Sequence, residues 1–376
     1  MYEKEKTAPN TLAPTSKGQP SINNNIIAHS VENCNSNDVD YKKILMQMKD
    51  PSYLSTISMS ELYENVYCKS PPIIDGLLYS GTYLFVGAPK VGKSFFMLQL
   101  AYHISTGTQL WEYPVRKGSV LYLALEDNYH RLQERLYRMF GTDNTPDLHF
   151  SVSAHQLGKG LAAQLGGFVQ EHRDTRLIII DTLQKVREIG GESYSYSNDY
   201  EIITQLKRFA DSTGICLLLV HHTRKQKADD TFDMISGTNG LLGAADGAFL
   251  LYKQKRTSNK AVLEVSGRDQ QDQKINLVRN DEKLCWDFES AETELWKEPP
   301  DPLLEKTAEF LKNKAEWSGT ATELVKLLKA DIKPNVITLK INVMAGRLLD
   351  EYGITYDGKS THNGRSITLR RNHNEA

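Results

Sequence analysis

Cysteine is scarce in this sequence, and its spacing argues against two common kinds of site. The 376 residues include four cysteines, Cys34, Cys68, Cys216 and Cys285, and no two of them form a CxxC pair. Structural zinc sites and disulfide frameworks need closely or regularly spaced cysteines. We therefore expect neither, and isolated thiols are typical of proteins in a reducing cytoplasm.

Long apolar runs and an excess of charge are also missing. No run approaches the about 18 apolar residues that span a membrane, and the first residues lack the apolar core of a signal peptide. Lysine and arginine number 45 against 47 aspartate and glutamate, which gives a net charge of −2. We therefore expect a cytoplasmic protein without membrane contact. The balance disfavours coating of nucleic acid through bulk basicity, but it permits a local basic patch.

The first 40 residues differ in composition from the rest of the chain. Asn, Ser, Pro, Thr and Lys dominate this segment, which includes the run Asn23-Asn24-Asn25. So little apolar surface cannot offset the entropy of ordering the chain, so we predict a disordered tail. A short amphipathic stretch at 41–48 is where we expect the folded part to begin.

Short apolar runs alternate with helical patterns between about residues 60 and 298. Helical stretches such as 94–105 and 200–213 separate the runs, which is typical of βα units on a parallel sheet. The last two runs have no helix between them and predict an antiparallel extension. The runs lie at residues 83–86, 120–125, 177–180, 215–220, 248–252 and 261–265.

A cluster of prolines, Pro299, Pro300 and Pro302, marks a domain boundary, because proline continues neither a helix nor a central strand. Three helical patterns and two strand-like segments follow it, which favours a winged-helix domain. The alternative is a small helical cap that mediates assembly. The helical patterns cover 303–317, 320–328 and 336–352, and the strand-like segments cover 354–357 and 366–371.

The predicted fold class is therefore α/β, with a mainly parallel central sheet and a small α+β domain after it. We expect a tail over 1–40, a core domain with a short lead-in over 41–298, and a winged-helix-like domain over 299–376.

A phosphate-binding loop follows the first apolar run and matches GxxxxGK[ST] in full, between a strand pattern and a helical one. Backbone N–H groups of such a loop converge on phosphates, because its glycines lack side chains and a helix begins there. Lys93 would neutralise the β- and γ-phosphates of ATP, and the Ser94 hydroxyl would ligate Mg²⁺. The loop reads Gly87-Ala88-Pro89-Lys90-Val91-Gly92-Lys93-Ser94.

Two acidic residues follow apolar strands and complete the expected metal edge of the sheet. Asp181 ends the run at 177–180, where ligands of open α/β sheets bind, and we expect it to serve Mg²⁺. The next residue is Thr182, so a catalytic carboxylate beside Asp181 is disfavoured. Glu126 ends a strand that we expect next to the phosphate-loop strand, and it could polarise the attacking water. Asp127 is the reserve candidate.

Two histidines, His221 and His222, end the fourth run. Adjacent strand residues face opposite ways and no third ligand is spaced nearby, so a metal site is disfavoured. A polar side chain at this edge is better placed to sense the γ-phosphate. We favour His222 as that sensor.

Together, these motifs resemble the RecA-like ATPases of the plasmid and phage RepA helicase type. The resemblance covers about residues 60–290 and includes Ile74-Asp75-Gly76-Leu77-Leu78 and Ser236-Gly237-Thr238. It implies a RecA-like core that binds ATP and Mg²⁺, assembles as a homo-oligomer such as a hexameric ring, and moves on single-stranded DNA. It assigns nucleotide binding to Lys93 and Ser94, the catalytic carboxylate to Glu126, Mg²⁺ to Asp181 and the sensor to His222.

Ring ATPases of this type receive an arginine finger from the neighbouring subunit. The correspondence is loose here: Arg268 is the first candidate and Arg256 the second. DNA contact is expected from the segment after the sensor strand and, outside the resemblance, from the C-terminal domain, where cations would bind phosphates in a salt-dependent way. The candidates are Arg224, Lys225, Lys340, Arg347, Lys359, Arg365, Arg370 and Arg371.

These features favour an ATP-driven DNA motor, either a RepA-type replicative helicase or a replication ATPase of a mobile element. The main alternative is an ATP-switched DNA-binding regulator or loader that does not unwind DNA. A recombination filament is less favoured because the segment before the core has the composition of a disordered tail. A metabolic kinase is least favoured because no acceptor-substrate domain is evident.

Overall fold

The structure is a computed structural model. It describes residues 50, 52–54, 56–67, 70–187, 196–222, 239–268, 270–293, 298–361 and 364–372. The predicted tail over 1–40 and the amphipathic stretch at 41–48 lie outside these residues. So does the segment 223–238 that follows the predicted sensor strand.

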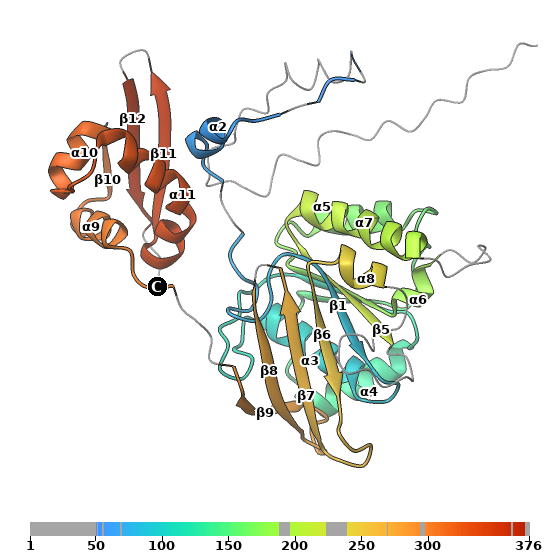
Figure 1. Ribbon diagram of the computed structural model, residues 1–376. Coiled ribbons are helices and arrows are strands. Elements are labelled where there is room, and N and C mark those ends of the chain that lie inside the picture. The colour runs from blue at the N-terminus through green and yellow to red at the C-terminus, as the bar shows by residue number, and fades with distance from the viewer. Residues whose placement is uncertain are drawn as a thin grey trace, which may run out of the picture.

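A nine-stranded sheet forms the centre of the larger unit, in the order β3-β2-β4-β5-β1-β6-β7-β8-β9 (Figure 1). Neighbouring strands run parallel from β3 to β6 and antiparallel from β6 to β9. The mainly parallel sheet and its antiparallel extension are therefore confirmed. The strands are β1 Gly81–Gly87, β2 Val120–Ala124, β3 Leu148–Ser151, β4 Leu177–Asp181, β5 Cys216–His222, β6 Gly247–Tyr252, β7 Lys260–Gly267, β8 Gln270–Arg279 and β9 Trp286–Ala291.

The central parallel strands are buried on both faces, which explains why they are continuously apolar in sequence. Alternate residues supply two separate cores: Phe85 packs with the first and Leu84 with the second. Sequence patterns missed β3, β8 and β9. β3 is only four residues long, and polar residues alternate with buried ones along β8, so neither contains a continuous apolar run.

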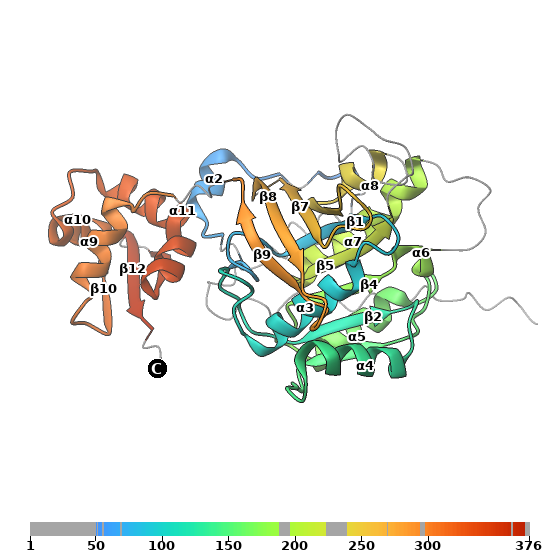
Figure 2. The same ribbon diagram turned by 90° about the horizontal axis from the view of Figure 1, so that it is seen from below.

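Helices cover both faces of the sheet (Figure 2). Residues of α3 Lys93–Thr106 and α4 Tyr129–Phe140 join the first core. The second core takes residues from four other helices, which are α5 Leu161–Glu171, α6 Leu183–Val186, α7 Tyr196–Thr213 and α8 Asn239–Ala244. The result is a three-layered α/β/α unit.

The predicted position of the strand before Glu126 is wrong. We expected this strand, β2, to lie beside the phosphate-loop strand β1, but β4 and β5 lie between them. Strands joined through long crossover segments need not be neighbours in a parallel sheet, so chain order does not fix strand order. Glu126 nevertheless belongs to the same sheet edge, because all of these strands run in the same direction.

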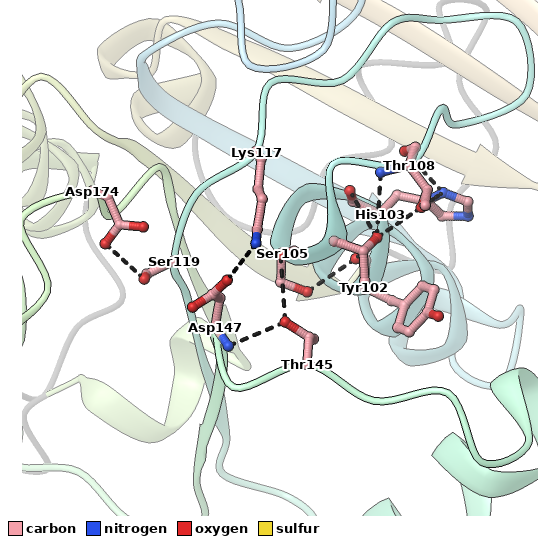
Figure 3. Close-up of polar contacts among 10 residues, drawn as sticks. Tyr102, His103, Ser105, Thr108, Lys117, Ser119, Thr145, Asp147 and Asp174 are labelled. Carbon is pink, nitrogen blue, oxygen red and sulfur yellow. Dashed lines mark hydrogen bonds and ion pairs between the residues drawn. The ribbon is translucent and has the colours of Figure 1, made fainter. Parts of the chain in front are cut away.

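Polar side chains tie together the amino ends of three parallel strands, as Figure 3 shows. Ser119, just before β2, donates a 2.8 Å hydrogen bond to Asp174, which precedes β4. Lys117 forms a 3.0 Å ion pair with Asp147, which precedes β3, and the Asp147 N–H donates to the Thr145 hydroxyl. These polar contacts therefore fix the amino ends of the strands, which lie at the opposite edge of the sheet from the phosphate loop.

The C-terminal unit has its own core and a three-stranded antiparallel sheet in the order β10-β12-β11. Asp301 caps the first helix by accepting from the Leu303 and Leu304 N–H groups, and Pro302 occupies the first turn. The elements are α9 Pro302–Phe310, β10 Glu316–Thr320, α10 Ala321–Leu328, α11 Pro334–Tyr352, β11 Ile354–Thr361 and β12 Gly364–Arg371.

The predicted helix over 303–317 is too long. The helix ends at Phe310, and Glu316 and Trp317 instead begin β10, where they pair with Arg370 and Leu369 of β12. This pairing partner lies more than 50 residues away, so local periodicity could not reveal it. The other two predicted helices and both strands of the hairpin are confirmed in type and place.

The short lead-in helix α2 Met59–Glu64 begins with a capping box between Ser58 and Glu61. It contacts α11 of the C-terminal unit, where the Asn342 amide donates to the backbone carbonyls of Tyr63 and Glu64, both at 3.0 Å. The Tyr356 hydroxyl donates in turn to Asn342. Among the described residues, no helix is long and apolar enough to cross a membrane.

Candidate nucleotide-binding site

The phosphate loop connects β1, which ends at Gly87, with α3, which begins at Lys93. In the parallel register, Gly87 pairs with His222 at the end of β5. Asp181 ends β4, which neighbours β5. The structure therefore brings the phosphate loop, the predicted Mg²⁺ carboxylate and the predicted sensor to one edge of the sheet.

Two loop positions require glycine. Gly92 has φ +112°, and a Cβ there would lie 2.9 Å from the ring of Trp286. At Gly87 a Cβ would lie 2.5 Å from the Leu251 carbonyl oxygen of β6. Both glycines therefore let backbone approach backbone or a bulky ring, and any side chain would displace the loop.

Lys93 is buried, with 7% of its surface exposed. Its Nζ donates to the Gly87 carbonyl at 2.7 Å and the Ala88 carbonyl at 3.2 Å, and it lies 3.2 Å from Nδ1 of His222. Burial lowers the pKa of Lys93 to about 8, and the carboxylates of Asp181 and Glu126 only partly oppose this. The lysine is therefore held inside the loop, within reach of the sensor strand.

His222 and His221 face opposite ways, as alternation along a strand requires. His222 is half-buried and meets Lys93, whereas His221 is buried. Burial, followed by the positive charge of Lys93, lowers the pKa of His222 below its ordinary value. A neutral ring is thereby favoured, and its Nδ1 can accept a hydrogen bond from Lys93.

Asp181 is surrounded by hydroxyl groups. Its Oδ2 accepts a 2.7 Å hydrogen bond from Tyr122, and the Ser94 hydroxyl also bonds to it. Burial raises the pKa of Asp181, while these two hydrogen bonds lower it. Tyr122 lies on β2 and was not predicted as a site residue; no sequence motif marks it, because its role depends on β2 lying beside β4.

Glu126 lies two residues beyond β2 and accepts a 3.2 Å hydrogen bond from the Thr182 hydroxyl. The threonine that takes the place of an acidic residue after Asp181 therefore contacts the candidate catalytic carboxylate. The reserve candidate Asp127 forms ion pairs with Arg131 and Arg135 of α4. These ion pairs hold the Asp127 carboxylate against α4, so Glu126 is the better candidate of the two for the catalytic carboxylate.

The residues present fit Mg²⁺. A hydroxyl from Ser94 and a carboxylate from Asp181 lie in contact, and Mg²⁺ prefers such oxygen ligands in combination with nucleotide phosphates. Ser94 and Asp181 are the residues that would hold the ion.

Trp286 of β9 is a second unpredicted neighbour of the loop. Its indole N–H donates to the Gly92 carbonyl at 3.4 Å, and its peptide group exchanges two hydrogen bonds with the Gln99 amide of α3, at 2.8 and 2.9 Å. The Trp111 indole also donates to the Trp286 carbonyl. The antiparallel extension is thereby joined to the helix that follows the phosphate loop.

The two arginine-finger candidates lie at opposite edges of the sheet. Arg268 directly follows β7 Lys260–Gly267, whose last residue pairs with Gly247 at the beginning of β6, away from the phosphate loop, and its guanidinium donates to the Gly243 carbonyl at 2.8 Å. Arg256 lies in the turn between β6 and β7, at the phosphate-loop edge. A finger acts on the neighbouring subunit, so this placement does not choose between them.

The predicted DNA-binding cations differ in their surroundings. Arg347 contacts Glu298 at 2.7 Å and Glu351 at 2.6 Å, and it also donates to the Pro299 carbonyl, so it holds the linker against α11. Arg370 pairs with Glu316, Arg371 donates to a backbone carbonyl, and Lys340 is exposed. Arg224 and Lys225 lie outside the described residues, as do the side chains of Lys359 and Arg365.

Comparison with known proteins gives matches over part of the chain. Residues 64–228 match the model of a family described as an AAA domain. The chain is 24% identical over 157 residues to the DNA repair protein RadA of Streptococcus pneumoniae, a match that covers 41% of this chain and 33% of RadA. The chain thus spans about a third of that relative's length.

Two solved structures are similar to the larger unit. One, an ATPase domain solved on its own, superposes with a TM-score of 0.50 at 14% identity, covering 67% of this chain and all of that domain. A DnaB-like replicative helicase, solved in a study of its interactions with primase, gives a TM-score of 0.47 at 15% identity, covering 66% of this chain and 68% of the helicase. The larger unit therefore has a RecA-like fold, and its phosphate loop and buried lysine lie within the residues that match the AAA-domain model.

Proposed function

We propose that this chain is an ATP-hydrolysing, DNA-dependent motor that works as a homo-oligomeric ring, most simply a hexamer. The role that fits best is a RepA-type replicative helicase or replication ATPase of a plasmid, phage or other mobile element. The proposal is supported by the ATPase fold, by the local similarity to a DNA repair protein, and by the RepA-type motifs on β2, β4 and β5.

The contact between Lys93 and His222 carries the proposal. Phosphate oxygens are stronger acceptors for an ammonium group than carbonyls or a neutral imidazole. A γ-phosphate would therefore compete for Lys93 Nζ, which now bonds to Gly87, Ala88 and His222. His222 would then be free to bond to the phosphate. The side chain at the end of β5 thus changes partner with the nucleotide, which is what a sensor needs.

The remaining site residues divide the chemistry of hydrolysis. Bound Mg²⁺ would neutralise phosphate charge, and Ser94 and Asp181 would hold it. Lys93 offsets the charge on the β- and γ-phosphates. Glu126 would orient and deprotonate the attacking water, and the hydrogen bond from Thr182 fixes the position of its carboxylate. Tyr122 keeps the Asp181 carboxylate directed toward Ser94.

The test is ATP hydrolysis with and without single-stranded DNA. We expect stimulation by DNA, loss of turnover in Lys93→Ala, and unchanged turnover in Lys159→Ala, which removes an exposed lysine on the surface before α5. Thermal unfolding of both variants confirms that the fold is intact. Equal rates of ATP hydrolysis with and without single-stranded DNA would contradict the proposal of a DNA-dependent motor.

The second candidate function is an ATP-switched DNA-binding regulator or loader. The C-terminal order of helix, strand, two helices and a hairpin supports it, because this is the arrangement of winged-helix domains that read duplex DNA. Slow turnover, unaffected by single-stranded DNA and combined with tight sequence-specific binding to a duplex, would favour the regulator over the motor.

A further inference from the structure

Arg279, the last residue of β8, lies beside the phosphate-loop helix and close to two aromatic rings. Its guanidinium carbon is 4.2 Å from the ring centre of Phe95 and 5.2 Å from that of Trp286. Phe95 directly follows Ser94 in α3, and Trp286 contacts Gly92. Both rings therefore adjoin the residues that bind the nucleotide.

The Arg279 guanidinium interacts electrostatically with Asp281 and Cys285, but its Nη1 has no hydrogen-bond partner among the described residues. This nitrogen is buried, and burial lowers the pKa of the guanidinium to about 10. Two neighbouring arginines have polar partners: Arg135 pairs with Asp127, and Arg138 donates to the carbonyls of Asp281 and Glu282. Buried donors are almost always paired, so an unpaired one beside a ligand site calls for an acceptor.

The backbone around Arg279 is firmly placed. Arg279 pairs with Trp286 in the ladder between β8 and β9, and the Trp286 peptide is held by Gln99 of α3. The Arg279 N–H donates to the Asn259 carbonyl, and Arg138 fixes the turn that follows. The arginine is therefore held at a constant position relative to the start of α3.

The side of the loop on which Arg279 lies indicates which part of a nucleotide it meets. The groups proposed to contact the β- and γ-phosphates lie on the side of β4 and β5. Asp181 ends β4, His222 ends β5, and Lys93 contacts His222. β8 lies on the opposite side of β1 from those strands. A guanidinium offers a flat face for stacking and in-plane N–H donors, which suits a purine base and its ring nitrogens.

We propose that Arg279 binds the nucleoside end of the bound nucleotide, with its guanidinium stacked on the base and donating hydrogen bonds to it. This inference rests on the proposed function, because it requires ATP at the phosphate loop. Phe95 and Trp286 hold the guanidinium in place from its other sides, and the arginine contributes to binding rather than to the hydrolytic step.

Two substitutions test the role of the planar cation. Arg279→Gln removes the charge, whereas Arg279→Lys keeps it and removes the flat, forked group. Lys283→Gln is the matched control, because it removes an exposed positive charge from the turn that follows β8. Thermal unfolding without nucleotide identifies a variant whose fold is damaged, in which case the other one is used.

The probes are ADP, a non-hydrolysable ATP analogue and inorganic tripolyphosphate, each with Mg²⁺, measured by titration calorimetry. For Arg279→Gln and Arg279→Lys we expect about tenfold weaker binding of ADP and of the analogue, by the same factor, because neither contact involves the γ-phosphate. Tripolyphosphate binding should stay within about twofold of wild type. The KM for ATP should rise about tenfold, with kcat nearly unchanged.

Unchanged ADP binding in both variants would overturn the inference. So would an equal loss for tripolyphosphate, since that would show a contact to phosphate rather than to the nucleoside. If Lys283→Gln weakened ADP binding as much as Arg279→Gln, the effect would come from the loss of positive charge in general and not from a contact of Arg279, which would contradict the inference. Failure of the wild-type protein to bind ADP or hydrolyse ATP would instead refute the proposed function, so the two failures are distinguishable.

Discussion

Charged residues in the two units of this protein have opposite surroundings. At the phosphate-loop edge, Lys93 and Asp181 are buried and lie close enough to affect each other's pKa. In the C-terminal unit, Arg347 and Arg370 lie near the surface in pairs with carboxylates of the same unit and of the linker before it. Burial makes the first set expensive to form, and this cost is consistent with a functional site. Surface pairs cost and contribute little, so their presence identifies no function.

Among the substitutions that test this contrast, Glu126→Gln has the largest expected effect. We expect it to lower kcat by about 10² to 10⁴, because in the proposed function Glu126 is the base that activates water, and the substitution leaves the phosphate loop intact. Nucleotide affinity should stay close to that of wild type. Asp127→Asn serves as the comparison, because Asp127 is engaged with Arg131 and Arg135. A larger loss of kcat in Asp127→Asn than in Glu126→Gln would reverse the assignment.

The pH dependence of ADP binding tests the burial of Lys93. The pKa of Lys93 is about 8 without nucleotide, below its ordinary value of 10.5. Phosphate stabilises the charged form and raises this pKa, so binding above pH 8 requires uptake of a proton. Below pH 7 Lys93 is already protonated, so we expect the ADP affinity not to depend on its titration. Above pH 8 we expect the ADP affinity to fall by up to about tenfold per pH unit.

Calorimetry in two buffers of different ionisation enthalpy measures that proton uptake directly. Lys93→Arg is the control, because arginine stays protonated across this range and its binding should lose the dependence. Proton release on binding, or a wild-type profile that stays flat to pH 9.5, would contradict a pKa lowered by burial.

Tyr122→Phe should have a smaller effect. It removes the hydroxyl that donates to Asp181 at 2.7 Å and leaves the aromatic ring in the core. A hydrogen bond to a charged group contributes about 1.5–3 kcal/mol, so we expect about a tenfold increase in the Mg²⁺ concentration that gives half-maximal hydrolysis. Tyr113→Phe, a matched removal of a hydroxyl in the same core, should leave that concentration unchanged.

The smallest expected effects are in the C-terminal unit. Lys340→Gln should lower the salt dependence of DNA binding by about one unit of the log–log slope, because Lys340 is exposed on α11. Arg347→Gln should leave the slope unchanged, since Arg347 is occupied by Glu298 and Glu351. Equal slopes for both variants would show that pairing in the structure does not decide which cations reach DNA.

Much of the site could be predicted because the phosphate loop, Asp181 and His222 all follow continuous apolar runs. Such runs form buried parallel strands, and the ends of parallel strands meet at one edge. Tyr122, Trp286 and Gln99 could not be predicted in this way. Their roles depend on β2 lying beside β4 and on β9 returning to α3, contacts between segments far apart in the chain.

The same distinction explains the errors. We placed β2 beside β1 because it follows β1 in the chain, but the crossover segments insert β4 and β5 between them. The helix over 303–317 was extended too far because residues 316 and 317 pair with β12, more than 50 residues away. Prediction therefore failed where distant segments decide the outcome, and it succeeded where local periodicity does.

The sequence by itself indicated the phosphate-loop motif, the mainly parallel core and a boundary near the prolines at 299–302, because these depend on local motifs, apolar runs and prolines. Only the tertiary structure decided which strands are neighbours, that Lys93 contacts His222, that Tyr122 donates to Asp181, and that Nη1 of Arg279 is buried without a hydrogen bond near Phe95. The physical reason is that burial and pairing are properties of side chains brought together from distant positions, and no single segment of the chain contains them.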